Sequence, residues 1–79
     1  MKLSYDPKYN VAYIRLRETT APVSTLHLSE ELNVDIGADG TVYGIELLNA
    51  NEQLQADAKG ALVVVNEASG ESVTIPLAF

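Results

Sequence analysis

Two short segments with an alternating apolar pattern flank the dipeptide Asp39-Gly40, and this pattern restricts the fold more than any other feature of the chain. The segments read LNVDIGA and TVYGIELL. Asp-Gly is a preferred dipeptide for the two-residue type I′ turn of a β-hairpin. With this tip, one face carries these pairs: Ala38 with Thr41, Ile36 with Tyr43, Val34 with Ile45, and Leu32 with Leu47. The other face is largely polar and pairs Asn33 with Glu46, Asp35 with Gly44, and Gly37 with Val42. A shift of one residue would mix the two faces, so the pattern predicts one register.

The same stretch also matches part of an EF-hand calcium loop. Asp35 falls at its first ligand position, Gly40 at its glycine and Glu46 at its last ligand position. However, the third position is Gly37, which has no side-chain oxygen, and the flanking segments alternate as strands do. We therefore interpret the stretch as a hairpin, and we expect the protein to bind neither a metal ion nor a cofactor.

The N-terminal part of the chain also favours strands. The pattern predicts strands over Lys2–Tyr5 and Val11–Arg17, joined by a turn at Asp6-Pro7, and a third strand over Val23–Leu28. After the central hairpin, NANEQLQADAKG loses the alternation. This segment predicts a short helix of about two or three turns that Asn49 or Asn51 caps and Gly60 ends, with Lys59 in its last turn.

The C-terminal segment ALVVVNEASGESVTIPLAF predicts another hairpin, with its turn at Ser69-Gly70. The expected pairs are Val65 with Thr74, Val64 with Ile75, Val63 with Pro76, and Leu62 with Leu77. Apolar side chains fall on both faces of this hairpin. Either the hairpin is buried on both sides, or one side contacts another subunit.

A chain of 79 residues favours a single domain over residues 1–79. A domain of this size buries only about 60% of its unfolded surface, so it needs an additional source of stability. The absence of cysteine excludes disulfides and thiolate zinc sites. We predict an α+β fold that is mostly β, in which antiparallel hairpins pack with one short helix and homo-oligomerisation completes the core.

The net charge of −6 is distributed unevenly along the chain. Residues 1–17 carry a net charge of +3 and residues 18–79 a net charge of −9. An acidic chain is a poor general ligand for nucleic acid, because phosphate contacts need clustered Lys and Arg. No apolar run reaches the roughly 18 residues of a membrane span, and the N-terminus lacks the apolar stretch of a signal peptide. We expect no nucleic-acid partner, no membrane association and a cytoplasmic location.

Two stretches, YDPKYNVAYIRL and SEELNVDIGADGTVYGIELLNANEQL, resemble the small prokaryotic domain of unknown function catalogued as number 2283. The matching positions are Tyr5, Asp6, Tyr13, Ile14, Asp35, Gly40, Gly44, Ile45 and Glu46. The resemblance covers residues 3–54 and implies a small β-rich fold without an established activity. The chain departs from the family pattern at Tyr9-Asn10, where the family usually has alanine and aspartate.

Three carboxylates, Asp6, Asp35 and Glu46, coincide with family-like positions. Such a set can bind metal or perform acid–base chemistry, and it can equally form structural pairs with basic neighbours in a sheet. His27 is the one histidine, and we expect it at the surface or edge of a strand.

The stripe Tyr9, Tyr13, Arg15 and Arg17 is the best candidate for an interaction surface, because aromatic and arginine side chains are enriched in interfaces. These features favour a non-catalytic protein-interaction or self-associating module, for example an antitoxin-like partner of another protein. The alternative is a small enzyme or metal-binding domain that uses Asp6, Asp35 and Glu46.

Overall fold

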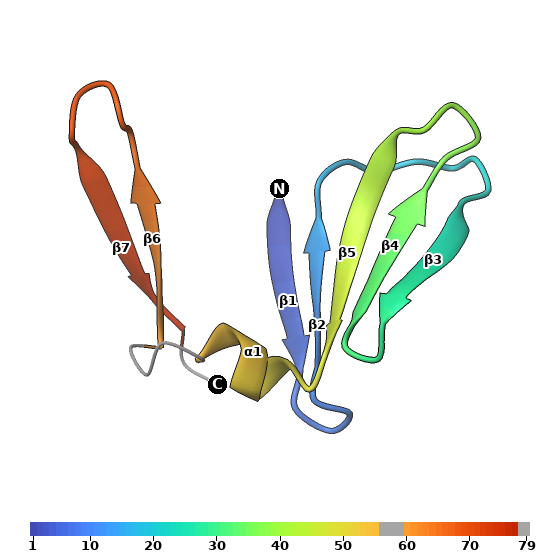
Figure 1. Ribbon diagram of the computed structural model, residues 1–79, viewed down its shortest axis with the longest axis horizontal. Coiled ribbons are helices and arrows are strands. Elements are labelled where there is room, and N and C mark those ends of the chain that lie inside the picture. The colour runs from blue at the N-terminus through green and yellow to red at the C-terminus, as the bar shows by residue number, and fades with distance from the viewer. Residues whose placement is uncertain (56–59, 78–79) are drawn as a thin grey trace.

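The computed structural model describes residues 1–55 and 60–77, and it shows a mostly β protein with one short helix (Figure 1). The elements are β1 (Lys2–Asp6), β2 (Val11–Arg15), β3 (Ser24–Ser29), β4 (Leu32–Ile36), β5 (Val42–Leu48), α1 (Ala50–Leu54), β6 (Ala61–Val65) and β7 (Ser72–Pro76). Five strands form an antiparallel sheet in the order β1-β2-β5-β4-β3, and β6 and β7 form a separate hairpin. The predicted class, α+β with mostly antiparallel strands, is confirmed.

The central hairpin of β4 and β5 has the predicted register over most of its length. The confirmed pairs are Leu32 with Leu47, Asn33 with Glu46, Val34 with Ile45, and Asp35 with Gly44. Near the tip, a bulge shifts the ladder, so Ile36 lies opposite Val42 and not opposite Tyr43 as predicted. The register holds below the bulge because it alone keeps the apolar side chains on one face.

The predicted type I′ turn is wrong. Such a turn needs positive φ at both central residues, whereas Gly40 has a φ of +86° and Asp39 is outside the left-handed region. The N–H of Gly40 donates to the carbonyl oxygen of Gly37 at 3.0 Å. The connection is therefore a longer loop that ends in a glycine bulge, and the extra residue causes the shift in the ladder.

The first predicted hairpin, β1 with β2, is confirmed, and β2 then pairs with β5 at the centre of the sheet. β2 ends at Arg15 instead of the predicted Arg17, because the N–H groups of Leu16 and Arg17 both point to the carbonyl oxygen of Tyr43. The third strand is also confirmed, although its bounds are Ser24–Ser29 instead of Val23–Leu28.

The pairing gives the five-stranded sheet two different faces. The apolar face carries Leu3, Tyr5, Ala12, Ile14, Leu26, Leu32, Val34, Ile45 and Leu47. The polar face carries Ser4, Tyr13, Arg15, Thr25, His27, Asn33, Asp35 and Glu46. Among the described residues, the buried apolar side chains are Ala12 and Ala50, and no large side chain is fully buried. The single chain thus leaves its apolar face without a compact core.

Asn10 joins α1 to the turn between β1 and β2. Its backbone is left-handed, with a φ of 55°, which asparagine tolerates better than most residues. Its carbonyl oxygen accepts the N–H of Ala50 at 3.0 Å, and its Oδ1 accepts the N–H of Asn51 at 2.9 Å. These N–H groups have no partner within the helix, so a turn distant in sequence caps it. Asn10 Nδ2 also donates to Asn51 Oδ1 at 2.7 Å, which a carboxylate at this position could not do.

Within the described residues, α1 is shorter than predicted and is capped differently. It spans Ala50–Leu54, whereas the prediction extended to Gly60. Residues 56–59, including Lys59, lie outside the described residues. Asn49 occupies the N-cap position, but its side chain makes no capping bond and donates instead to Glu52 Oε2 at 2.8 Å.

The hairpin of β6 and β7 stands away from the sheet (Figure 1). Its pairs are Ala61 with Pro76, Leu62 with Ile75, Val63 with Thr74, Val64 with Val73, and Val65 with Ser72. The predicted register is therefore wrong. The strands are joined by a loop between Asn66 and Glu71, which is longer than the predicted two-residue turn at Ser69-Gly70. The N–H of Asn66 donates to the carbonyl oxygen of Glu71 at 2.8 Å and closes this loop. The shift is by an even number of positions, so the predicted assignment of residues to the two faces holds.

The contacts and the left-handed backbone of Asn10 predict that two substitutions at this position lower the free energy of unfolding by different amounts. Asn10→Gly removes the side-chain bonds but keeps the left-handed backbone accessible, and it should lower the free energy of unfolding by about 1–2 kcal/mol. Asn10→Ala removes the same bonds and adds backbone strain, so it should cost about 1 kcal/mol more. Urea unfolding measures both values. Equal costs for the two variants would show that the positive φ does not constrain this position.

Candidate functional site

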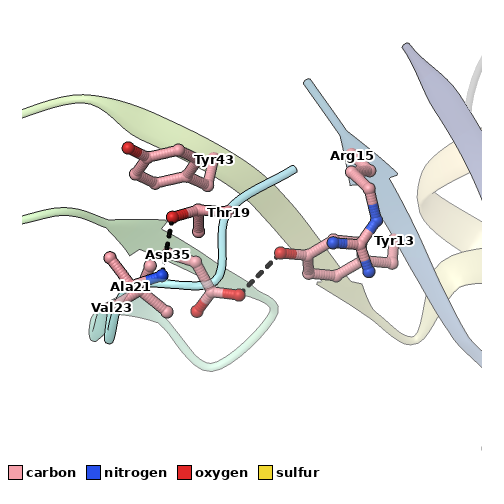
Figure 2. A pocket seen from close by; sticks show the side chains of 7 residues that line it. All are labelled: Tyr13, Arg15, Thr19, Ala21, Val23, Asp35 and Tyr43. Atoms are coloured by element: carbon pink, nitrogen blue, oxygen red, sulfur yellow. Dashed lines mark hydrogen bonds between the residues drawn. The ribbon is translucent and has the colours of Figure 1, made fainter. Parts of the chain in front are cut away.

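The polar face carries a hydrogen-bonded network around the carboxylate of Asp35. Its Oδ2 accepts the hydroxyl of Tyr13 at 2.6 Å, and its Oδ1 accepts the hydroxyl of Thr25 at 2.7 Å. Figure 2 shows the phenol of Tyr13 pointing at Asp35. Because these residues lie on β2, β4 and β3, the network links strands from one side of β5 to the other.

Gly44 on β5 allows the phenol of Tyr13 to reach Asp35. It lies opposite Arg15 on one neighbouring strand and opposite Asp35 on the other. A Cβ atom at Gly44 would overlap the ring and the hydroxyl of Tyr13. Glycine is therefore required here for space across the sheet, and the backbone conformation does not require it.

A cavity of about 360 Å³ opens beside this network. Its lining residues are Tyr13, Arg15, Thr19, Ala21, Val23, Asp35 and Tyr43 (Figure 2). The guanidinium of Arg15 lies 5.4 Å from the ring centroid of Tyr13, within cation–π range. The carboxylate of Asp35 accepts one structural hydrogen bond at each oxygen, and the two bonds join it to β2 and β3.

The network also changes the acid–base behaviour of Tyr13. Its hydrogen bond to the Asp35 carboxylate raises the pKa of the Tyr13 hydroxyl above its ordinary value of 10.0, and partial burial raises it further. The bond favours the neutral phenol because only the protonated oxygen can donate. Tyr13 is therefore a hydrogen-bond donor and not an activated base at neutral pH.

The other two predicted carboxylates have separate structural partners. Glu46 Oε1 accepts a bond from Asn33 Nδ2 at 2.9 Å, and Asn33 is only 5% exposed. Asp6 is the last residue of β1, and its Oδ1 accepts the N–H of Lys8 in the following turn at 2.9 Å. Within residues 1–55 and 60–77, no three His, Asp or Glu side chains form a group that could hold a metal ion. The register places all three carboxylates on the polar face, with Asp6 at the end of the edge strand β1 and Asp35 and Glu46 on the inner strands β4 and β5.

The predicted aromatic and basic stripe is distributed over three structural environments. Tyr9 is exposed in the turn, with the ammonium of Lys8 5.2 Å from its ring centroid. Tyr13 and Arg15 lie side by side on the polar face. Arg17 follows the end of β2.

His27 lies exposed on β3, opposite Asn33.

The C-terminal hairpin carries a group of exposed apolar side chains. Val64 and Val73, which are paired on one face, are 52% and 60% exposed. Val63 on the opposite face is 51% exposed. The strands Ala61–Val65 and Ser72–Pro76 contain no charged residue. On the sheet, Leu26 of the apolar face is 45% exposed.

Residues 2–51 match the family described as "Protein of unknown function (DUF2283)". Because the match covers more than half of the chain, the protein belongs to this family. The matched range contains β1 to β5 and the start of α1, and the hairpin of β6 and β7 lies beyond it. Comparisons with curated proteins and with solved structures find no match. In the described part of the chain, no helix has the length and apolar character needed to cross a membrane.

Sequence reasoning missed the roles of Gly44 and Asn10. The predicted hairpin already placed Gly44 opposite Asp35, which was the available signal. The position of Tyr13 on the other side of Gly44 depends on β2 pairing with β5, and no local pattern encodes that pairing. Asn10 was noted as a departure from the family pattern, but its contact with α1 is equally non-local.

The crossing of Tyr13 over Gly44 predicts strong coupling between these two residues. Gly44→Ala should lower the free energy of unfolding by about 1–3 kcal/mol, because the new methyl group displaces the phenol. In a Tyr13→Ala background, the same substitution should cost close to nothing, because the space is empty. A double-mutant cycle by urea unfolding measures the coupling. Equal costs in both backgrounds would contradict the proposed steric reason.

The raised pKa of Tyr13 predicts a loss of stability at alkaline pH. The folded state holds the Tyr13 proton to a higher pH than the unfolded state, so its contribution is complete below about pH 10 and falls as the pH rises through the folded pKa. The stability difference between wild type and Tyr13→Phe should therefore shrink above this pH. Urea unfolding of both proteins between neutral and strongly alkaline pH tests this, and a constant difference would refute it.

Proposed function

We propose that this protein is a non-catalytic protein-interaction module that binds through its C-terminal hairpin and the apolar face of its sheet. The observation that carries the proposal is a hairpin with uncharged strands and exposed valines on both faces. Isolated apolar residues are common on protein surfaces, but contiguous apolar patches mark sites of interaction.

The arrangement of the hairpin supports this proposal. An isolated two-stranded hairpin is marginally stable in water and needs packing against another element. β6 and β7 pair with each other and not with the five-stranded sheet. A partner that covers the hairpin would supply the missing packing.

The state of the carboxylates is also consistent with a non-catalytic role. Asp35, Glu46 and Asp6 each accept a hydrogen bond from a group that holds the fold together. These bonds give each carboxylate a structural role. The apolar surface, by contrast, is exposed, and its burial against a partner would lower the free energy.

Photo-crosslinking in the cells that naturally produce the protein tests this function. A photoreactive amino acid at Val64 or Val73 should give covalent adducts with a protein, because these paired positions lie on one exposed face of the hairpin in the proposed binding surface. The same group at Ser4, on the polar face, is the matched control and should give few adducts. Adducts either with other copies or with a different protein support the proposal. Absence of adducts at both hairpin positions would overturn it.

A further inference from the structure

Resting on the proposed function, we infer that the partner is a second copy of this chain. In this dimer, the hairpin of each copy lies on the apolar face of the other copy's five-stranded sheet. The docking surface of the hairpin is the face that carries Leu62, Val64, Val73 and Ile75. Its receiving surface is the part of the apolar face formed by β3 and β4, with Leu26 and Val34.

The surface area of the single chain supports association. The chain exposes 5871 Å², whereas a compact monomer of 8.5 kDa exposes about 4,700 Å². The excess of about 1,200 Å² exceeds the roughly 800 Å² that each partner contributes to an interface of standard size. The radius of gyration, 14.2 Å, is also larger than the roughly 12 Å expected for a compact chain of this length.

The two surfaces have matching chemistry. The strands of the hairpin contain no charged residue, and the apolar face of the sheet carries none in its paired strands. Their contact would therefore bury no unpaired charge, which is the usual cost of covering a protein surface. Two sheets packed face to face also form a standard layered architecture.

The position of the hairpin leaves β3 and β4 open to a second copy. Its base lies near β1 and β2, where an entirely apolar cavity of about 270 Å³ is present. The cavity is lined by Met1, Leu3, Ile14, Leu54, Leu62 and Leu77. At the other side of the sheet, Leu26 remains 45% exposed. An exchange of hairpins between two copies uses the same pair of surfaces twice, so it closes as a symmetric dimer.

Two substitutions, one on each proposed surface, test the dimer. Val64→Asp places a charge on the docking face of the hairpin, and Leu26→Asp places one on the receiving face of the sheet. By analytical ultracentrifugation, wild type should dimerise, and each variant should raise the dimer dissociation constant at least about tenfold. Matched controls are Val63→Asp, on the opposite face of the hairpin at nearly equal exposure, and His27→Asp, the neighbour of Leu26 on the polar face. Both controls should stay dimeric.

Mixing the two disruptive variants gives the decisive result. The Leu26→Asp copy has an intact hairpin, and the Val64→Asp copy has an intact sheet face. Their mixture should therefore form a heterodimer through one wild-type contact at concentrations where each variant alone is mostly monomeric. A dimer formed by two hairpins alone would not respond to Leu26→Asp and would not be restored by mixing. Either of those results overturns the inference.

Cysteine pairing provides a second measurement that does not depend on the aspartate variants folding. The chain contains no cysteine, so single cysteines can be introduced without background. A short bismaleimide should join Leu26→Cys to Val64→Cys in a mixture of the two proteins more efficiently than it joins Leu26→Cys to Val63→Cys. Equal yields for both mixtures would contradict the proposed docking face.

The two proposals can fail separately. If wild type is monomeric at all concentrations while photo-crosslinking from the hairpin captures a different protein, the second-copy inference is wrong and the interaction function stands. If the hairpin gives no adduct and the chain is monomeric, both are wrong.

Discussion

The need to cover one apolar sheet face governs the organisation of this protein. Alternation along five antiparallel strands places side chains such as Ile14, Val34 and Ile45 on a single face, and such a face is stable only against another layer. Within the described residues, the chain fully buries small side chains, Ala12 and Ala50, and no large one. The helix α1 is too short to cover five strands, and the C-terminal hairpin stands apart. The described part of the fold is therefore incomplete in its apolar packing, and this supports association with a partner.

On the polar face, by comparison, side chains from different strands bond to one another within the chain. The phenol of Tyr13 passes over Gly44 and donates to Asp35, while Asn33 donates to Glu46. These residues include most of the polar positions that carry the resemblance to the family. Their chemistry in this structure is the cross-linking of strands, both consecutive ones (Asn33 to Glu46) and ones distant in sequence (Tyr13 to Asp35). Within the family pattern, Tyr13, Asp35 and Glu46 thus have structural partners on the polar face. Ile45 lies on the opposite, apolar face.

Asn10 connects this sheet to the helix α1, which follows β5. Its amide accepts the N–H of Asn51 and donates to the Asn51 side chain, so the first turn of α1 is held against the turn between β1 and β2. In chain order, α1 stands between the five-stranded sheet and the C-terminal hairpin. The family match ends at the start of α1, so the matched range provides the sheet and the remaining residues provide the most exposed apolar element. In the proposed dimer, these two parts of the chain bind each other in trans.

The sequence alone determined the strands, the central hairpin register around Val34 and Ile45, and the division of the sheet into an apolar and a polar face. These features follow from side-chain alternation and turn preference, which are local properties. It also determined that the C-terminal hairpin is apolar on both faces. Only the tertiary structure decided that β2 lies beside β5, so that Gly44 leaves space for the phenol of Tyr13 to reach Asp35. It also decided that Asn10 caps a helix far along the chain. Those contacts join residues that are distant in sequence, and their formation depends on how whole strands are ordered in the sheet, which no short pattern of residues specifies.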